Sequence, residues 1–143
     1  MKRTILILGI LILSSSCGSE QQQPVPDGPP RTKEEVSQMR MVAGRWRSDV
    51  GVLPGQDRRH VILDIANDGS VSMQLRERGP KMDIVLAESM GKVALVEDGI
   101  TGSLSEPGKD LRFFRSFSAA MPSAGILDVQ GSGASIEMTY TGQ

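Results

Sequence analysis

The chain has 143 residues, of which 38% are apolar and 23% charged, an ordinary balance that excludes an intrinsically disordered or collagen-like protein and predicts one small domain. Its 16 lysines and arginines against 17 aspartates and glutamates give a net charge of -1, which is unlike the basic surface of a nucleic-acid binder. A single histidine and a single cysteine leave too few such side chains for the usual metal centre or nucleophilic dyad.

The first 16 residues have the three parts of a secretory signal. Lys2 and Arg3 form a basic start, residues 5–13 are apolar apart from one glycine, and residues 14–16 are serines that precede Cys17. About ten apolar residues span roughly 15 Å as a helix, half of the roughly 30 Å of bilayer hydrocarbon. The segment is therefore predicted to be a removed signal and not a transmembrane helix.

This start resembles a bacterial lipoprotein signal, in which a lipobox ends at the cysteine that becomes the first residue of the mature chain. The resemblance implies that Cys17 carries a diacylglyceryl thioether and usually a third acyl chain, and several chains anchor a protein stably where one does not. The family favours leucine at the position that Ser14 occupies here, one residue after Leu13. The alternative is an ordinary signal peptide cut near Ser16, which would leave a free thiol.

Gly18 bears on which membrane holds the anchor. It stands where, in the enterobacterial sorting rule, an aspartate retains lipoproteins in the inner membrane. The resemblance therefore implies an outer-membrane anchor with the domain in the periplasm, or exposed at the cell surface. No cofactor is expected.

Residues 17–31 are rich in Gln, Pro and Gly, which predicts an extended tether because so few apolar side chains cannot support folding. A helix is predicted next, over residues 33–42 within a capped segment 32–43. Thr32 and Glu35 have the spacing of a capping box, and Val36, Met39 and either Val42 or Ala43 fall on one face.

From Gly44 to the end of the chain, at residue 143, the sequence predicts a β domain. Apolar residues alternate and turn residues recur about every eight to twelve positions, which is typical of antiparallel strands. The clearest segment is a hairpin in which Val61–Ile65 and Val71–Leu75 flank a turn at residues 67–69 that tolerates positive φ. Further strands are predicted over residues 45–48, 82–86, 92–96, 100–104, 111–117, 126–130 and 135–141.

These elements predict a mainly β protein: an antiparallel meander that closes into a small barrel or a two-sheet sandwich, preceded by one short helix. Parallel pairing is not expected, because no long crossover helix separates two strands. The Gly44-Arg45-Trp46 motif at the first strand resembles the start of lipocalin-like domains, where Gly-x-Trp closes one barrel end. That resemblance implies a cup-shaped fold without fixing a ligand.

Candidate chemical sites are few. His60 has the chemistry of a proton shuttle or metal ligand, but a surface or strand-end histidine beside Arg58 and Arg59 is the simpler interpretation. Met39 and Met41 resemble the Met-x-Met pairs of periplasmic copper(I) proteins, although residues two apart on a helix face different ways, which favours core packing. We expect no catalytic constellation, no metal site and no enzymatic activity.

The arginines are the remaining candidates. Arg45, Arg47, Arg58 and Arg59 would form an anion or lipid-headgroup patch if the fold brought them together near the tether. Because aspartates are interspersed among them, the alternative is a solvated surface of mixed charge.

Two functions remain open from the sequence. The first is a noncatalytic interaction or assembly protein that holds an envelope partner through a sheet edge or face. The alternative is a lipocalin-like carrier of a small apolar ligand, since an eight-stranded barrel has room for one. The feature that separates them is whether large inward residues fill the centre; the expected ones are Leu63, Met73, Phe113 and Phe117.

Overall fold

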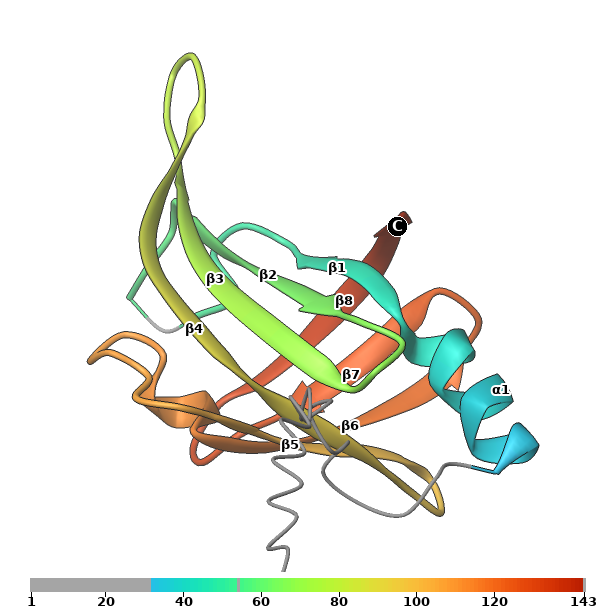
Figure 1. The fold of residues 1–143 in the computed structure, drawn as a ribbon. Coiled ribbons are helices and arrows are strands. Elements are labelled where there is room, and N and C mark those ends of the chain that lie inside the picture. The colour runs from blue at the N-terminus through green and yellow to red at the C-terminus, as the bar shows by residue number, and fades with distance from the viewer. Residues whose placement is uncertain (1–31, 54, 143) are drawn as a thin grey trace, which may run out of the picture. The chain divides into compact units, whose positions relative to one another are not determined.

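The computed structural model describes residues 32–53 and 55–142, so the predicted signal, Cys17 and the tether lie outside the described residues. The described part is one helix followed by eight antiparallel strands that form a closed barrel, each paired with its neighbours in sequence and β8 with β1 (Figure 1). The predicted mainly β class is confirmed, and the barrel is the form adopted.

The elements are α1 Lys33–Val42, β1 Gly44–Ser48, β2 Arg59–Ile65, β3 Ser70–Arg78, β4 Asp83–Val96, β5 Gly99–Leu104, the 3-10 turn η1 Arg112–Phe114, β6 Ser116–Ser123, β7 Ile126–Gln130 and β8 Ser135–Gly142.

The helix α1 begins at the predicted capping box. The Thr32 amide donates to the Glu35 carboxylate at 2.6 Å, and the Glu35 amide donates to the Thr32 hydroxyl at 3.2 Å. Met39 and Val42 are buried, whereas Val36 is exposed. The apolar face therefore begins one turn later than predicted, because only the C-terminal end of α1 reaches the barrel core.

The predicted hairpin of β2 and β3 is confirmed with its register. Val61 pairs with Leu75 and Leu63 with Met73, so that alternate side chains of both strands point into the barrel. The turn closes with Gly69 at φ 86°, a left-handed conformation that glycine adopts without strain.

Two strand predictions were wrong. Segments 82–86 and 92–96 belong to one strand of 14 residues, β4, because the intervening Ser89 and Gly91 continue the pairing with β3 instead of turning. The segment predicted as a strand over 111–117 contains η1, and β6 starts only at Ser116. As a consequence Phe114 is fully buried, and Phe113 packs against the core from its margin.

The barrel interior is filled by apolar side chains from all eight strands, which form one cluster. Connections of an up-and-down barrel alternate between its two ends, and both ends are occupied. Met39 and Val42 of α1 close the end where β1 starts, while Leu53, Leu111 and Phe114 from two connections close the other. This core holds three of the large residues expected at the centre, Leu63, Met73 and Phe117.

Candidate interaction site on the β3–β4 hairpin

The β3–β4 hairpin is the candidate site, because it projects beyond the barrel as a long twisted ribbon (Figure 1). β4 pairs with β3 along Asp83–Lys92 but with β5 only from Gly91 onward. Among the described residues, the segment Asp83–Glu88 has no strand on its β5 side; we call it the β4 edge. Its outward backbone amides and carbonyls are available to another strand.

Apolar side chains are concentrated on and beside the β4 edge. Met82 is 72% exposed, Ile84 53%, Val85 46% and Leu86 40%. Isolated exposed apolar residues are ordinary, but several consecutive ones on an open strand edge mark an interaction site. The sequence predicts a strand over 82–86, but nothing in its pattern indicates that this strand lacks a partner on one side.

Asp83 fixes the hairpin to the barrel. Its Oδ2 lies 3.2 Å from Nε2 of His60 on β2 and 3.9 Å from a guanidinium nitrogen of Arg47 on β1. These contacts join the start of β4 to two strands that are not its neighbours. The first residue of the β4 edge thus lies against the barrel, and the rest of the edge is positioned by its pairing with β3.

His60 lies near the start of β2, as the strand-end expectation had it, but it is fully buried, so the expected surface position was wrong. It points to the outer side of β2, opposite to the inward Val61 and Leu63, and the start of β4 lies against it. Neither ring nitrogen makes a hydrogen bond to the described residues. Burial lowers the pKa of His60, the positive charge of Arg47 lowers it further, as do Arg76 and Arg78, and Asp83 opposes them.

This lowered pKa predicts a pH dependence of stability. The unfolded chain takes up a proton on His60 near the ordinary pKa of 6.5, before the folded chain does. The stability that the neutral His60 ring contributes to the folded state is thus fully present above pH 6.5. It is lost as the pH falls from there toward the lowered pKa of His60 in the folded chain. Urea unfolding should show a larger drop in the free energy of unfolding from about pH 7.5 to about pH 5 for wild type than for His60→Gln. Equal drops in the two proteins would contradict the assignment.

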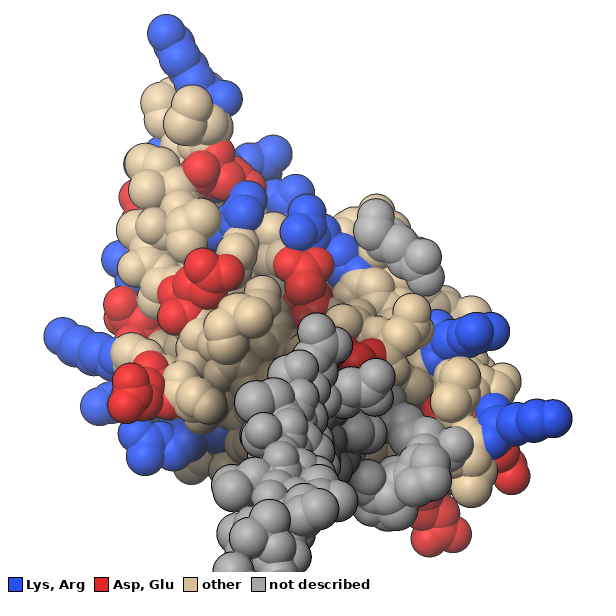
Figure 2. All heavy atoms as spheres, in the orientation of Figure 1, with Lys and Arg blue, Asp and Glu red and all other residues tan. Residues whose placement is uncertain are grey.

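Each of the four predicted patch arginines contacts an acidic side chain or a backbone carbonyl. Arg45 forms a two-pronged ion pair with Asp64, with its Nε 2.8 Å from Oδ1, and Arg59 pairs with Glu77 at 3.3 Å. The guanidinium of Arg58 donates to the carbonyl of Arg78 at 3.0 Å, and Arg47 faces Asp83. Figure 2 shows acidic and basic side chains interspersed beside the hairpin.

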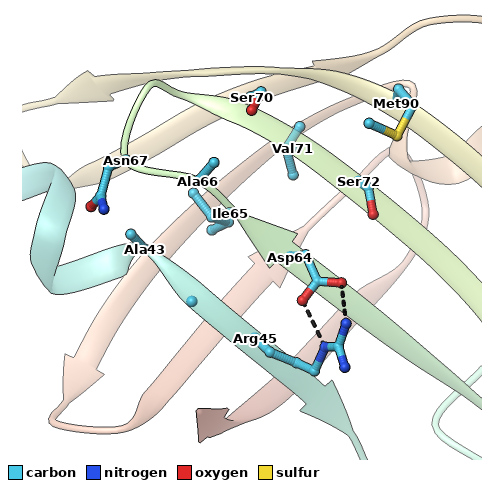
Figure 3. Close-up of a pocket in the computed structure, with 11 residues that line it drawn as sticks. Ala43, Arg45, Asp64, Ile65, Ala66, Asn67, Ser70, Val71, Ser72 and Met90 are labelled. Carbon is cyan, nitrogen blue, oxygen red and sulfur yellow. Dashed lines mark hydrogen bonds and ion pairs between the residues drawn. The ribbon is translucent and has the colours of Figure 1, made fainter. Parts of the chain in front are cut away.

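A surface pocket of about 420 Å³ lies outside the barrel beside the β2–β3 turn (Figure 3). The Arg45–Asp64 ion pair lies along one side, and Ser72 and Met90 lie toward the other. Ile65 and Val71 also line it and are almost fully buried, whereas Met90 is 58% exposed. The pocket therefore offers a ligand apolar surface at Met90, beside the charged Arg45–Asp64 pair.

Within residues 32–53 and 55–142, no three His, Cys, Asp or Glu side chains are close enough to hold a metal ion. The described helical residues include no segment long and apolar enough to cross a membrane.

Comparison with known proteins adds no relative: no protein-family model, curated protein or solved structure matches the chain. Interpretation of the site therefore depends on its residues alone.

Proposed function

We propose that the protein is a noncatalytic envelope lipoprotein, anchored in the outer membrane through lipidated Cys17, whose β domain lies in the periplasm and holds a partner protein. The observation that carries the proposal is the β4 edge, an open strand flanked by exposed apolar side chains and fixed to the barrel through Asp83. Such an edge binds an extended segment of another protein by adding a strand to the sheet.

The filled interior supports the interaction proposal over the alternative, a carrier of a small apolar ligand. A carrier of the lipocalin type holds its ligand inside the barrel, where Trp46, Met73 and Leu75 are at most 1% exposed here. The outer pocket favours the alternative, since about 420 Å³ is within the size range of ligand sites. It is the weaker candidate for an apolar ligand because it lies on the surface beside the charged Arg45–Asp64 pair.

Photocrosslinking in native membranes tests the proposal. A photoreactive amino acid at Leu86, on the β4 edge, should give a discrete crosslinked product. The matched control is Val96, which is on the same strand and 49% exposed but is paired with Gly99 of β5. Equal products from both positions, or none from Leu86, would contradict the proposal.

The anchor makes a separate prediction. Cys17→Ser removes the thiol that would carry lipid, so the protein should move from the membrane to the soluble fraction, because stable anchoring needs the acyl chains. Fractionation with mass spectrometry of the N-terminal peptide measures both location and modification. A wild-type protein that is itself soluble, with an unmodified Cys17, would refute the lipid anchor while leaving the β4 edge to be tested independently.

A further inference from the structure

We propose that the strand which completes the β4 edge is the same edge of a second copy of this chain, paired antiparallel about a two-fold axis. This inference rests on the proposed function, because it names the partner of the site proposed there. Three properties of the β4 edge support it: its backbone, its side chains and its charges.

The backbone of the β4 edge selects a strand as the occupant. Its outward amides and carbonyls recur at strand spacing on either side of a β-bulge at Leu86, and an extended segment matches that repeat. Native proteins usually protect an open edge with Lys or Pro, with a bulge, or by a covering loop. Asp83–Glu88 contains no Lys or Pro, and among the described residues no loop pairs with it, so the bulge at Leu86 is the one such device in this segment.

The side chains select an apolar strand. Ile84 and Val85 are consecutive, so they point to opposite faces of the ribbon, and both are about half exposed. An added strand must therefore present apolar side chains on both faces. The β4 edge itself has this property, so two copies are complementary to each other.

The charges select the antiparallel direction. Lys81 precedes the apolar centre and Glu88 follows it. Antiparallel pairing places the Lys81 end of one copy beside the Glu88 end of the other, whereas parallel pairing would place like charges together. Asp83 does not disturb this arrangement, since its carboxylate faces His60 and Arg47 of its own domain.

Two-fold pairing also explains why so apolar an edge need not cause uncontrolled association. The same surface is used on both copies, so one contact covers both edges and the assembly is closed at two chains. Anchoring in one membrane would raise the effective concentration of the copies and favour a contact of modest area.

Cysteine crosslinking of the full, detergent-solubilised chain tests the inference. Residues near a two-fold axis meet their own counterparts, so Val85→Cys should give a disulfide-linked homodimer on mild oxidation. Val96→Cys, with similar exposure, should give at least about tenfold less, since it lies away from the axis. The unsubstituted chain, analysed in parallel, measures any crosslink through Cys17.

Sedimentation in detergent supplies the second readout. The wild type should have the mass of two chains, and Leu86→Lys should weaken the dimer by at least about tenfold, because a charge on the β4 edge opposes pairing. Leu86 is exposed in the single chain, so the circular dichroism spectrum of the Leu86→Lys variant should match that of the wild type. Val96→Lys, the control on the same strand, should leave the dimer intact.

The outcomes separate the inference from the proposed function. A monomer in detergent that crosslinks from Leu86 to a different protein in native membranes would overturn the inference and leave the proposed function in place. The absence of any product from Leu86, in membranes or in detergent, would overturn both. Equal homodimer yields from Val85→Cys and Val96→Cys would overturn the inference.

Discussion

Trp46→Ala is expected to lower the free energy of unfolding by about 3 to 5 kcal/mol, a large part of a small domain's stability. The Trp46 ring is 1% exposed, its indole N–H donates to the Val42 carbonyl at 2.8 Å, and its ring meets Tyr140 edge-on at 5.2 Å between centroids. It thus joins the end of α1, β1 and β8, and an alanine would leave a cavity and an unpaired carbonyl.

Urea denaturation of the wild type, Trp46→Ala and Trp46→Phe would measure this effect. Trp46→Phe keeps an aromatic ring but loses the hydrogen bond, so its cost should be smaller, about 1 to 2 kcal/mol. A loss below about 1 kcal/mol for Trp46→Ala would contradict the role of the Gly-x-Trp motif in closing this end of the barrel.

Gly91→Ala is the second substitution expected to have a large effect, about 3 kcal/mol, at the upper end for overpacking. A β-carbon at this position would lie 1.9 Å from the carbonyl oxygen of Ser103, so the β5 backbone would have to move. Gly91 is where β4, after running along β3, first pairs with β5. The absence of a β-carbon at Gly91 is what lets the backbones of β4 and β5 approach each other there.

Gly108→Ala is the matched control, because a β-carbon there has nothing within 4 Å. Its stability should stay within about 0.5 kcal/mol of the wild type in the same thermal or urea assay. If Gly91→Ala were equally neutral, the close approach of β4 and β5 would not be required for the fold.

Much of the fold could be predicted because local chemistry and tertiary packing agree there. The capping box of α1 needs only Thr32 and Glu35, and the β2–β3 hairpin combines strict alternation with a turn that ends in Gly69. The alternating pattern of side chains gave a wrong prediction over 111–117, where Phe113, Arg115 and Phe117 indicated a strand. Burial of Phe114 at the closed barrel end outweighs that pattern and requires a turn.

The candidate site could be predicted only in part, because it depends on strand pairing and not on a motif. The apolar run at Ile84–Leu86 is visible in the sequence, but its exposure follows from β5 ending its pairing at Gly91. His60 shows the same limit. Its neighbours in sequence are Arg59 and Val61, yet its environment depends on burial, on Arg47 of β1 and on Asp83, which the twisted hairpin brings to it.

Hydrogen exchange at the β4 edge would show whether this edge gains a strand from a partner. In an antiparallel sheet, alternate backbone amides of a strand donate to the strand on one side and the remaining amides to the strand on the other. The amides of Asp83–Glu88 that face away from β3 should therefore exchange rapidly in dilute detergent. In native membranes, where the partner is present, these amides should become protected while those of β7 and β8 change little. Rapid exchange of these amides in both states would contradict the gain of a strand.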